Sequence, residues 1–155
     1  MLIFKALHIL SMFAAVTFLI GEALLYARAI SRGDVADLAT VRRLVGGRPL
    51  FGVAFLMSGI VFGLLAALTG EIDLFEGWLI AAYVLVVAMF LVNASPWVQR
   101  LPTLGQEAIE AVAGQRPVEE VVTAMAASRR GILVVVALNV LLFVAVIADM
   151  VLKPF

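Results

Sequence analysis

The sequence lacks cysteine, contains one histidine, and is poor in charge, with 14% of its 155 residues charged. The absence of cysteine excludes disulfides, iron–sulfur ligation and thiolate metal sites. Walker loops, dinucleotide fingerprints and Ser/His/Asp sets are also absent, which argues against classical hydrolytic or phosphoryl-transfer enzymes. Its 11 basic and 11 acidic residues cancel, so charge indicates no nucleic-acid partner and we expect none.

What the chain has is apolar sequence. Hydrophobic residues make up 65% of it, against 45–50% in typical soluble domains, and the mean hydropathy is +1.15. About 20 apolar residues cross a bilayer. We therefore predict an all-α polytopic membrane protein, a four-transmembrane-helix bundle forming one integral domain over residues 1–155. The predicted spans are about 2–28, 50–69, 78–97 and 131–152.

The connections carry amphipathic sequence. Asp34 resembles an N-cap for a short helix, with an apolar stripe at helical spacing formed by Val35, Leu38, Val41 and Val45. We expect this helix to lie in the headgroup plane; the alternative is a solvated connector. Residues 106–113 and 117–128 also have helical spacing, and we expect the second segment to continue into the last span.

Arginines gather in two of the three connections. They are Arg28, Arg32, Arg42, Arg43 and Arg48 between the first two spans, and Arg100, Arg116, Arg129 and Arg130 between the last two. Residues 70–77 contain no basic residue. The positive-inside rule then predicts cytoplasmic basic connections and both termini outside, in a cytoplasmic (inner) membrane of bacterial type.

Three polar side chains fall inside predicted spans: Glu22, Asn93 and Asn139. A charged, unpaired Glu22 in hydrocarbon would cost about 2.5 kcal/mol or more, so we expect it to be protonated or paired with Asn93 or Arg129. It is either an interhelical clasp or a proton relay. Asn139 is expected to donate an interhelical hydrogen bond.

The only histidine, His8, has two interpretations. It is either an axial ligand to haem iron or an interfacial residue beside Lys5, hydrogen-bonded to a neighbour such as Asp149. As a ligand it would fill one axial position. The sixth ligand would then be a methionine, a lysine, a second subunit's His8, or nothing.

Small residues at Gly59 and Gly63 form a ridge of the small-xxx-small type. Such ridges let helix backbones approach closely in lipid, where no hydrophobic force drives helices together. We expect this ridge to face another helix of the chain. The alternatives are a second subunit, which would make a homodimer, or a planar cofactor.

Both ends of the chain resemble a known family. The residues are Lys5-Ala-Leu-His8-Ile-Leu, Arg42-Arg43-Leu44 and Val151-Leu-Lys153-Pro154-Phe155. With the four-span layout, they resemble the membrane-bound, haem-containing protoporphyrinogen oxidases. Copper-resistance D-type domains and a branch of predicted membrane proteins of unknown function share this layout. That branch is the closer fit, because Phe13-Ala-Ala-Val-Thr17 replaces the expected aromatic-glycine pattern.

The resemblance implies that His8 binds haem. The favoured hypothesis is a membrane protein that holds haem b through His8 for electron transfer or oxidoreduction, with Lys5 neutralising a propionate. A second hypothesis is a non-enzymatic accessory or scaffold subunit of a larger membrane complex. A small-solute or copper transporter is a third. Whether the protein is an enzyme stays open.

Overall fold

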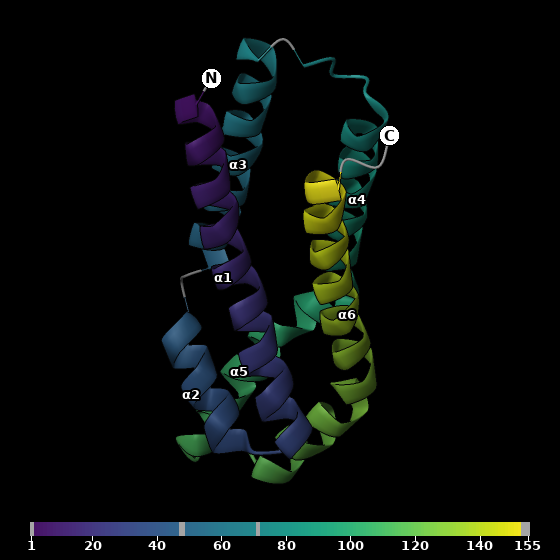
Figure 1. The fold of residues 1–155 in the computed structure, drawn as a ribbon. Helices are drawn as coiled ribbons and strands as arrows, with labels where there is room; N and C mark the ends of the chain where they lie inside the picture. The colour runs from purple at the N-terminus through teal and green to yellow at the C-terminus, as the bar shows by residue number, and fades with distance from the viewer. Residues whose placement is uncertain (1, 47–48, 71, 153–155) are drawn as a thin grey trace. The chain divides into compact units, whose positions relative to one another are not determined.

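The computed structural model describes residues 2–46, 49–70 and 72–152, and all regular structure in these ranges is α-helical. The helices are α1 (Leu2–Arg32), α2 (Val35–Val45), α3 (Pro49–Thr69), α4 (Gly77–Asn93), α5 (Pro96–Val112) and α6 (Val118–Leu152) (Figure 1). Arg48 and Lys153, which entered the predictions above, lie outside the described residues.

Within the described residues, three helical segments are by themselves long and apolar enough to cross a membrane: Leu2–Arg32, Phe51–Thr69 and Val118–Leu152. A fourth crossing exists if α4 and α5, bent by 44° at their junction, form one broken span. The all-α, polytopic membrane architecture predicted from the sequence is confirmed.

The break between α4 and α5 has a local cause. Pro96 opens α5, and Ser95 before it adopts φ −63° and ψ 149°, the extended conformation that a following proline favours. As a result α4 ends at Asn93, short of the predicted end near residue 97. At the other long connection, residues 118–128 continue without interruption into the last span, as expected from their spacing.

The chain divides into two compact units, described separately below. We call residues 1–19, 48–89 and 141–155 the apolar unit, and residues 20–47 and 90–140 the charged unit. The long helices α1 and α6 each contribute to both.

In the apolar unit, the first half of α1 lies beside α3 (Figure 1). The ring of Phe18 stacks on that of Phe55 at a centroid distance of 5.8 Å and also contacts Phe51. Many large apolar side chains point outward, among them Phe13, which is 75% exposed. Such a surface matches a lipid environment rather than water.

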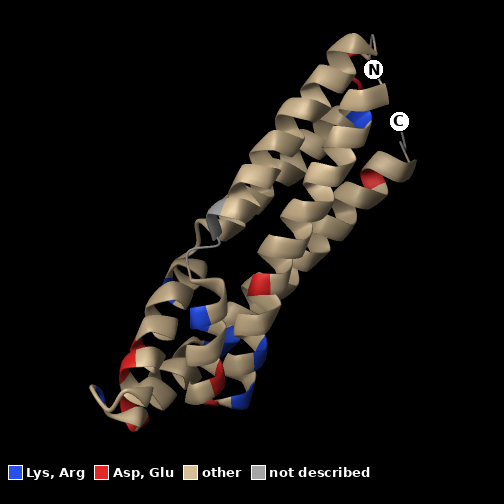
Figure 2. Cartoon of the chain, turned by 90° about the vertical axis from the view of Figure 1, so that its left-hand side faces the viewer, with Lys and Arg blue, Asp and Glu red and all other residues tan. Residues whose placement is uncertain are grey.

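The charged unit has a conventional buried core. Helices α2 and α5 pack against each other and against parts of α1 and α6. The side chains of Tyr26, Leu38, Leu104, Val121 and Met125 are almost fully buried there. Figure 2 shows most of the acidic and basic residues on these helices.

The N-cap predicted for α2 is confirmed, but the predicted environment of the helix is wrong. The Asp34 carboxylate accepts hydrogen bonds from the backbone N–H groups of Ala36 and Asp37, with N···Oδ1 distances of 2.9 and 3.0 Å. The apolar stripe is buried in the core instead of meeting lipid headgroups or solvent. The amphipathic α5 supplies the covering surface, which periodicity within α2 could not reveal.

Candidate functional site

His8 is held by a backbone contact to α3. Its Nδ1 lies 2.7 Å from the carbonyl oxygen of Gly59. A carbonyl only accepts hydrogen bonds, so Nδ1 carries a proton, and in the neutral imidazole Nε2 then has the lone pair. The partner at Nδ1 is therefore the α3 backbone and not Asp149, the neighbour suggested from the sequence. Asp149 Oδ2 is buried and has no hydrogen-bond partner among the described residues.

The glycine ridge of α3 receives side chains of α1. A Cβ on Gly63 would lie 2.8 Å from His8 Nδ1, and one on Gly59 would lie 2.7 Å from the sulfur of Met12. A third glycine, Gly52, is packed in the same way against Leu19. A Cβ on Gly52 would lie 2.7 Å from Leu19 Cδ2. Gly52 was missed in the sequence, although its spacing of seven residues from Gly59 places it on the same helix face.

Lys5 lies three residues before His8, about one helical turn away, and its side chain is exposed. It makes no ion pair within the described part of the chain. Lys5 is thus a cation near the same end of α1 as the imidazole.

The charged unit contains the other polar residues that fall inside predicted spans. The side-chain amide of Asn93 in α4 donates to Asn139 Oδ1 in α6 at 2.9 Å. The sequence indicated interhelical hydrogen bonds for both residues but did not pair them. The structure joins them in one amide–amide contact.

The cation beside Glu22 is Arg42 of α2, not Arg129. Arg42 interacts electrostatically with the Glu22 carboxyl and with the hydroxyl of Tyr26, one turn further along α1. Tyr26 is 1% exposed, and no well-aligned hydrogen bond to its hydroxyl is present among the described residues. Gly105 of α5 makes room for the arginine, since its Cβ would lie 2.8 Å from Arg42 Cβ.

Arg42 lies on the same face of α2 as the apolar stripe. Arg42 follows Val35 by seven residues and Leu38 by four, so helical geometry places it on the buried stripe. A cation at such a position requires an anionic or strongly polar partner nearby. That spacing was the signal that could have identified the Glu22–Arg42 contact.

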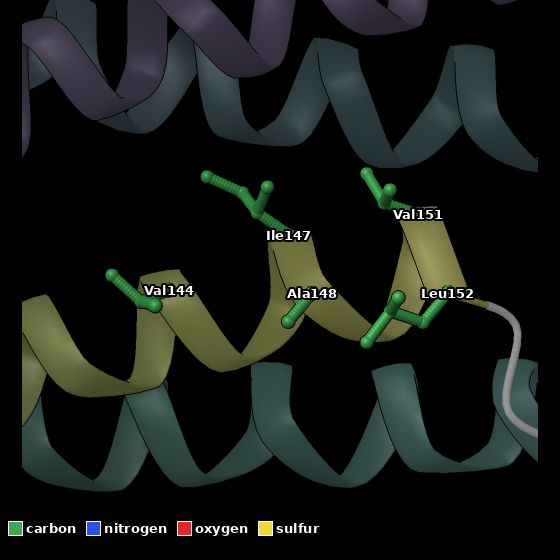
Figure 3. Close-up of a pocket in the computed structure, with 5 residues that line it drawn as sticks. All are labelled: Val144, Ile147, Ala148, Val151 and Leu152. Atoms are coloured by element: carbon green, nitrogen blue, oxygen red, sulfur yellow. The ribbon is translucent and has the colours of Figure 1, made fainter.

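A hollow with a volume of about 380 Å³ lies on α6 in the apolar unit. Its lining is Val144, Ile147, Ala148, Val151 and Leu152, which project from successive turns of the helix (Figure 3). These side chains carry no polar atom that could orient a ligand. His8 does not line this hollow.

The profile of a family described as "Predicted integral membrane protein (DUF2269)" matches residues 2–154. No curated protein matches the chain. No solved structure matches it either.

Proposed function

The chain belongs to this family of predicted integral membrane proteins, and from that premise we propose that it binds a b-type haem through His8. The bound group would serve electron transfer or oxidoreduction in the membrane. The family carries no assigned function, so the proposal depends on the chemistry of the residues around His8.

The observation that carries the proposal is the 2.7 Å contact between His8 Nδ1 and the Gly59 carbonyl. Metal-ligating histidines almost always donate their second ring nitrogen to a carbonyl, carboxylate or water, which fixes the tautomer and the ring orientation. Here that contact leaves Nε2 as the free donor atom. It also makes the imidazole more electron-rich, which strengthens binding to iron.

The donor set favours haem over a bare metal ion. No group of three or more His, Cys, Asp or Glu side chains within the described residues could hold a metal. Haem iron needs fewer protein ligands, because the porphyrin supplies four nitrogens. A single oriented imidazole in an apolar setting fits that requirement.

The surroundings of His8 also fit the group. Gly63 leaves space for the imidazole against α3, and Met12 fills the neighbouring position at Gly59. Lys5, one turn away, is a cation that could pair with a propionate. Haem would supply one-electron redox chemistry, while the chain would contribute the axial nitrogen and an environment with little water. The resemblance of residues 5–10 to the haem-containing membrane oxidases supports the same assignment.

The test is an absorption spectrum of detergent-purified protein from haem-supplemented expression, oxidised and then reduced with dithionite. We expect a Soret band that shifts on reduction, disappears in His8→Ala, and returns when imidazole is added to that variant. Asn139→Ala is the matched control, because it removes an intramembrane polar group but keeps the histidine. A flat spectrum of the unaltered protein would refute haem binding.

A second candidate is a non-enzymatic accessory or scaffold subunit of a larger membrane complex. Its support is that polar groups interact within the chain: Asn93 donates a hydrogen bond to Asn139, and Arg42 interacts electrostatically with Glu22. In that case the His8–Gly59 hydrogen bond is a structural contact that holds α1 against α3. A flat spectrum together with a defined set of co-purifying membrane proteins would favour this function.

The orientation is also part of the proposal, with the basic connections in the cytoplasm and both termini outside. Because the chain has no cysteine, a single introduced cysteine reports its own side of the membrane. With a membrane-impermeant maleimide on intact cells, we expect labelling of Phe75→Cys and no labelling of Gln115→Cys. The reverse pattern would overturn the orientation.

A further inference from the structure

A second hollow lies within the charged unit, between the end of α1 and the first turns of α6, and has a volume of about 250 Å³. Unlike the hollow on the far part of α6, it combines an apolar floor with a basic rim. The floor includes Ile30, Val122 and Met125, and the rim includes Ser31, Arg32 and Arg129.

The floor is rigidly supported by the core. Ile30 and Met125 are 2% and 1% exposed, so each presents only an edge to the hollow. Val122 is 41% exposed and extends the apolar surface outward. A ligand in this hollow would meet a firm apolar surface beneath its polar group.

The two rim arginines are not neutralised by the protein. Arg32 and Arg129 are exposed, and neither forms an ion pair within the described ranges. Three acids of the charged unit are ion-paired with other arginines: Glu107 with Arg100, and Glu110 and Glu120 with Arg116.

Asp34, the acid next in sequence to this rim, is also occupied, because its carboxylate caps the N-terminus of α2. Arg32 and Arg129 therefore line the same hollow, and neither is ion-paired within the described residues. Guanidinium groups bind phosphate oxygens in bidentate geometry, which makes phosphate the matching ligand chemistry.

Both arginines also stand at ends of apolar helical segments. Arg32 is the last residue of α1, and Arg129 precedes the apolar run of α6 that begins at Ile132. Basic residues beside a membrane-spanning segment commonly meet the phosphates of anionic lipids. A free phosphate would use the rim but leave the apolar floor uncovered.

We propose that this hollow binds the headgroup phosphate of an anionic phospholipid. Arg32 and Arg129 contact the phosphate oxygens, and the Ser31 hydroxyl is available as a further donor. One acyl chain runs from the phosphate towards the apolar segment of α6 that begins at Ile132. This site is independent of haem binding at His8, so either proposal can fail without the other.

The test uses the full chain, delipidated in a neutral detergent, with lipid binding followed by native mass spectrometry. The probes are dioleoyl phosphatidylglycerol and dioleoyl phosphatidylcholine, which share acyl chains and differ in net charge. We expect the unaltered protein to prefer phosphatidylglycerol. The double variant Arg32→Gln/Arg129→Gln should lose about 30-fold in apparent affinity for it, because both phosphate contacts are removed.

The matched control is Arg43→Gln/Arg130→Gln, which removes the same charge from two exposed arginines that do not line the hollow. It should stay within about threefold of the unaltered protein. Circular dichroism checks that both double variants retain the helices. Equal losses in the two double variants would overturn the proposal, because general charge attraction would then explain the preference.

A competition experiment distinguishes a lipid headgroup from free phosphate as the ligand. Inorganic phosphate at a large excess should leave the bound phosphatidylglycerol in place, because the acyl contact adds to the affinity. Complete displacement would show that the rim recognises phosphate alone, and would overturn the lipid as the occupant.

Discussion

The two units of this protein differ in where their large apolar side chains lie, although both include parts of α1 and α6. In the charged unit, large side chains such as Leu104 and Met125 are buried and the charged residues face outward or pair. In the apolar unit, Phe13 and many other large apolar side chains are exposed. Water favours burial of apolar side chains, whereas lipid does not penalise their exposure, so close packing there depends on small residues.

The strongest test of this contrast compares two leucines. Leu104→Ala removes a fully buried side chain from the charged unit and should lower the free energy of unfolding by about 3 kcal/mol. Leu141→Ala, at a position 64% exposed in the apolar unit, should change it by less than about 1 kcal/mol. Reversible unfolding in mixed micelles, followed by circular dichroism, measures both. Similar losses in the two variants would contradict the assignment of lipid to the apolar unit.

The next test concerns the glycine ridge. Gly63→Val places methyl groups where the His8 ring lies, and should cost about 2 kcal/mol because α1 must move away from α3. It should also abolish the Soret band, if the band depends on the orientation of His8.

The control for this test is Gly21→Ala in α1, where an added Cβ meets nothing within 4 Å. Alanine is the better helix former by about 1 kcal/mol, so this variant should match or exceed the stability of the unaltered protein. Equal destabilisation by both substitutions would show that the ridge is not a packing surface.

A smaller effect is expected at the contact between Glu22 and Arg42. A double-mutant cycle with Glu22→Gln and Arg42→Gln should give a coupling free energy of about 1 kcal/mol, because the two charges interact in a half-buried setting. The parallel cycle of Glu22→Gln with Arg129→Gln should give no measurable coupling. Coupling to Arg129 instead would restore the pairing inferred from the sequence and contradict the structure.

The smallest expected effect is at the paired amides. A cycle with Asn93→Ala and Asn139→Ala should give about 0.6 kcal/mol, the average measured for side-chain hydrogen bonds between membrane helices. Thermal unfolding in detergent measures it. A coupling above about 2 kcal/mol would indicate that these amides hold together more than one pair of helices.

Local features were accessible from the sequence because neighbouring residues cause them. Asp34 caps α2 through the two N–H groups directly after it, and Pro96 breaks the helix at the residue before it. The continuous helix from Val118 into the last span follows in the same way from unbroken helical spacing. In each case the deciding interaction spans only a few residues.

Contacts between helices were harder to infer. The sequence predicted an amphipathic α2 but assigned its stripe to the headgroup region, because periodicity shows which face is apolar and not what covers it. The contacts of Glu22 with Arg42 and of His8 with Gly59 depend on the register in which distant helices pack. The neighbours expected from depth alone were Arg129 for Glu22 and Asp149 for His8.

By itself, the sequence determined that this is a polytopic helical membrane protein, that Asp34 caps a helix, and which polar residues require partners. Long apolar runs and the energetic cost of bare polar groups in lipid are sufficient for those conclusions. Only the tertiary structure decided that α2 joins a buried core, that Arg42 lies beside Glu22, and that a backbone carbonyl orients His8. Those outcomes depend on side-chain shape and packing register, which link residues far apart in the chain.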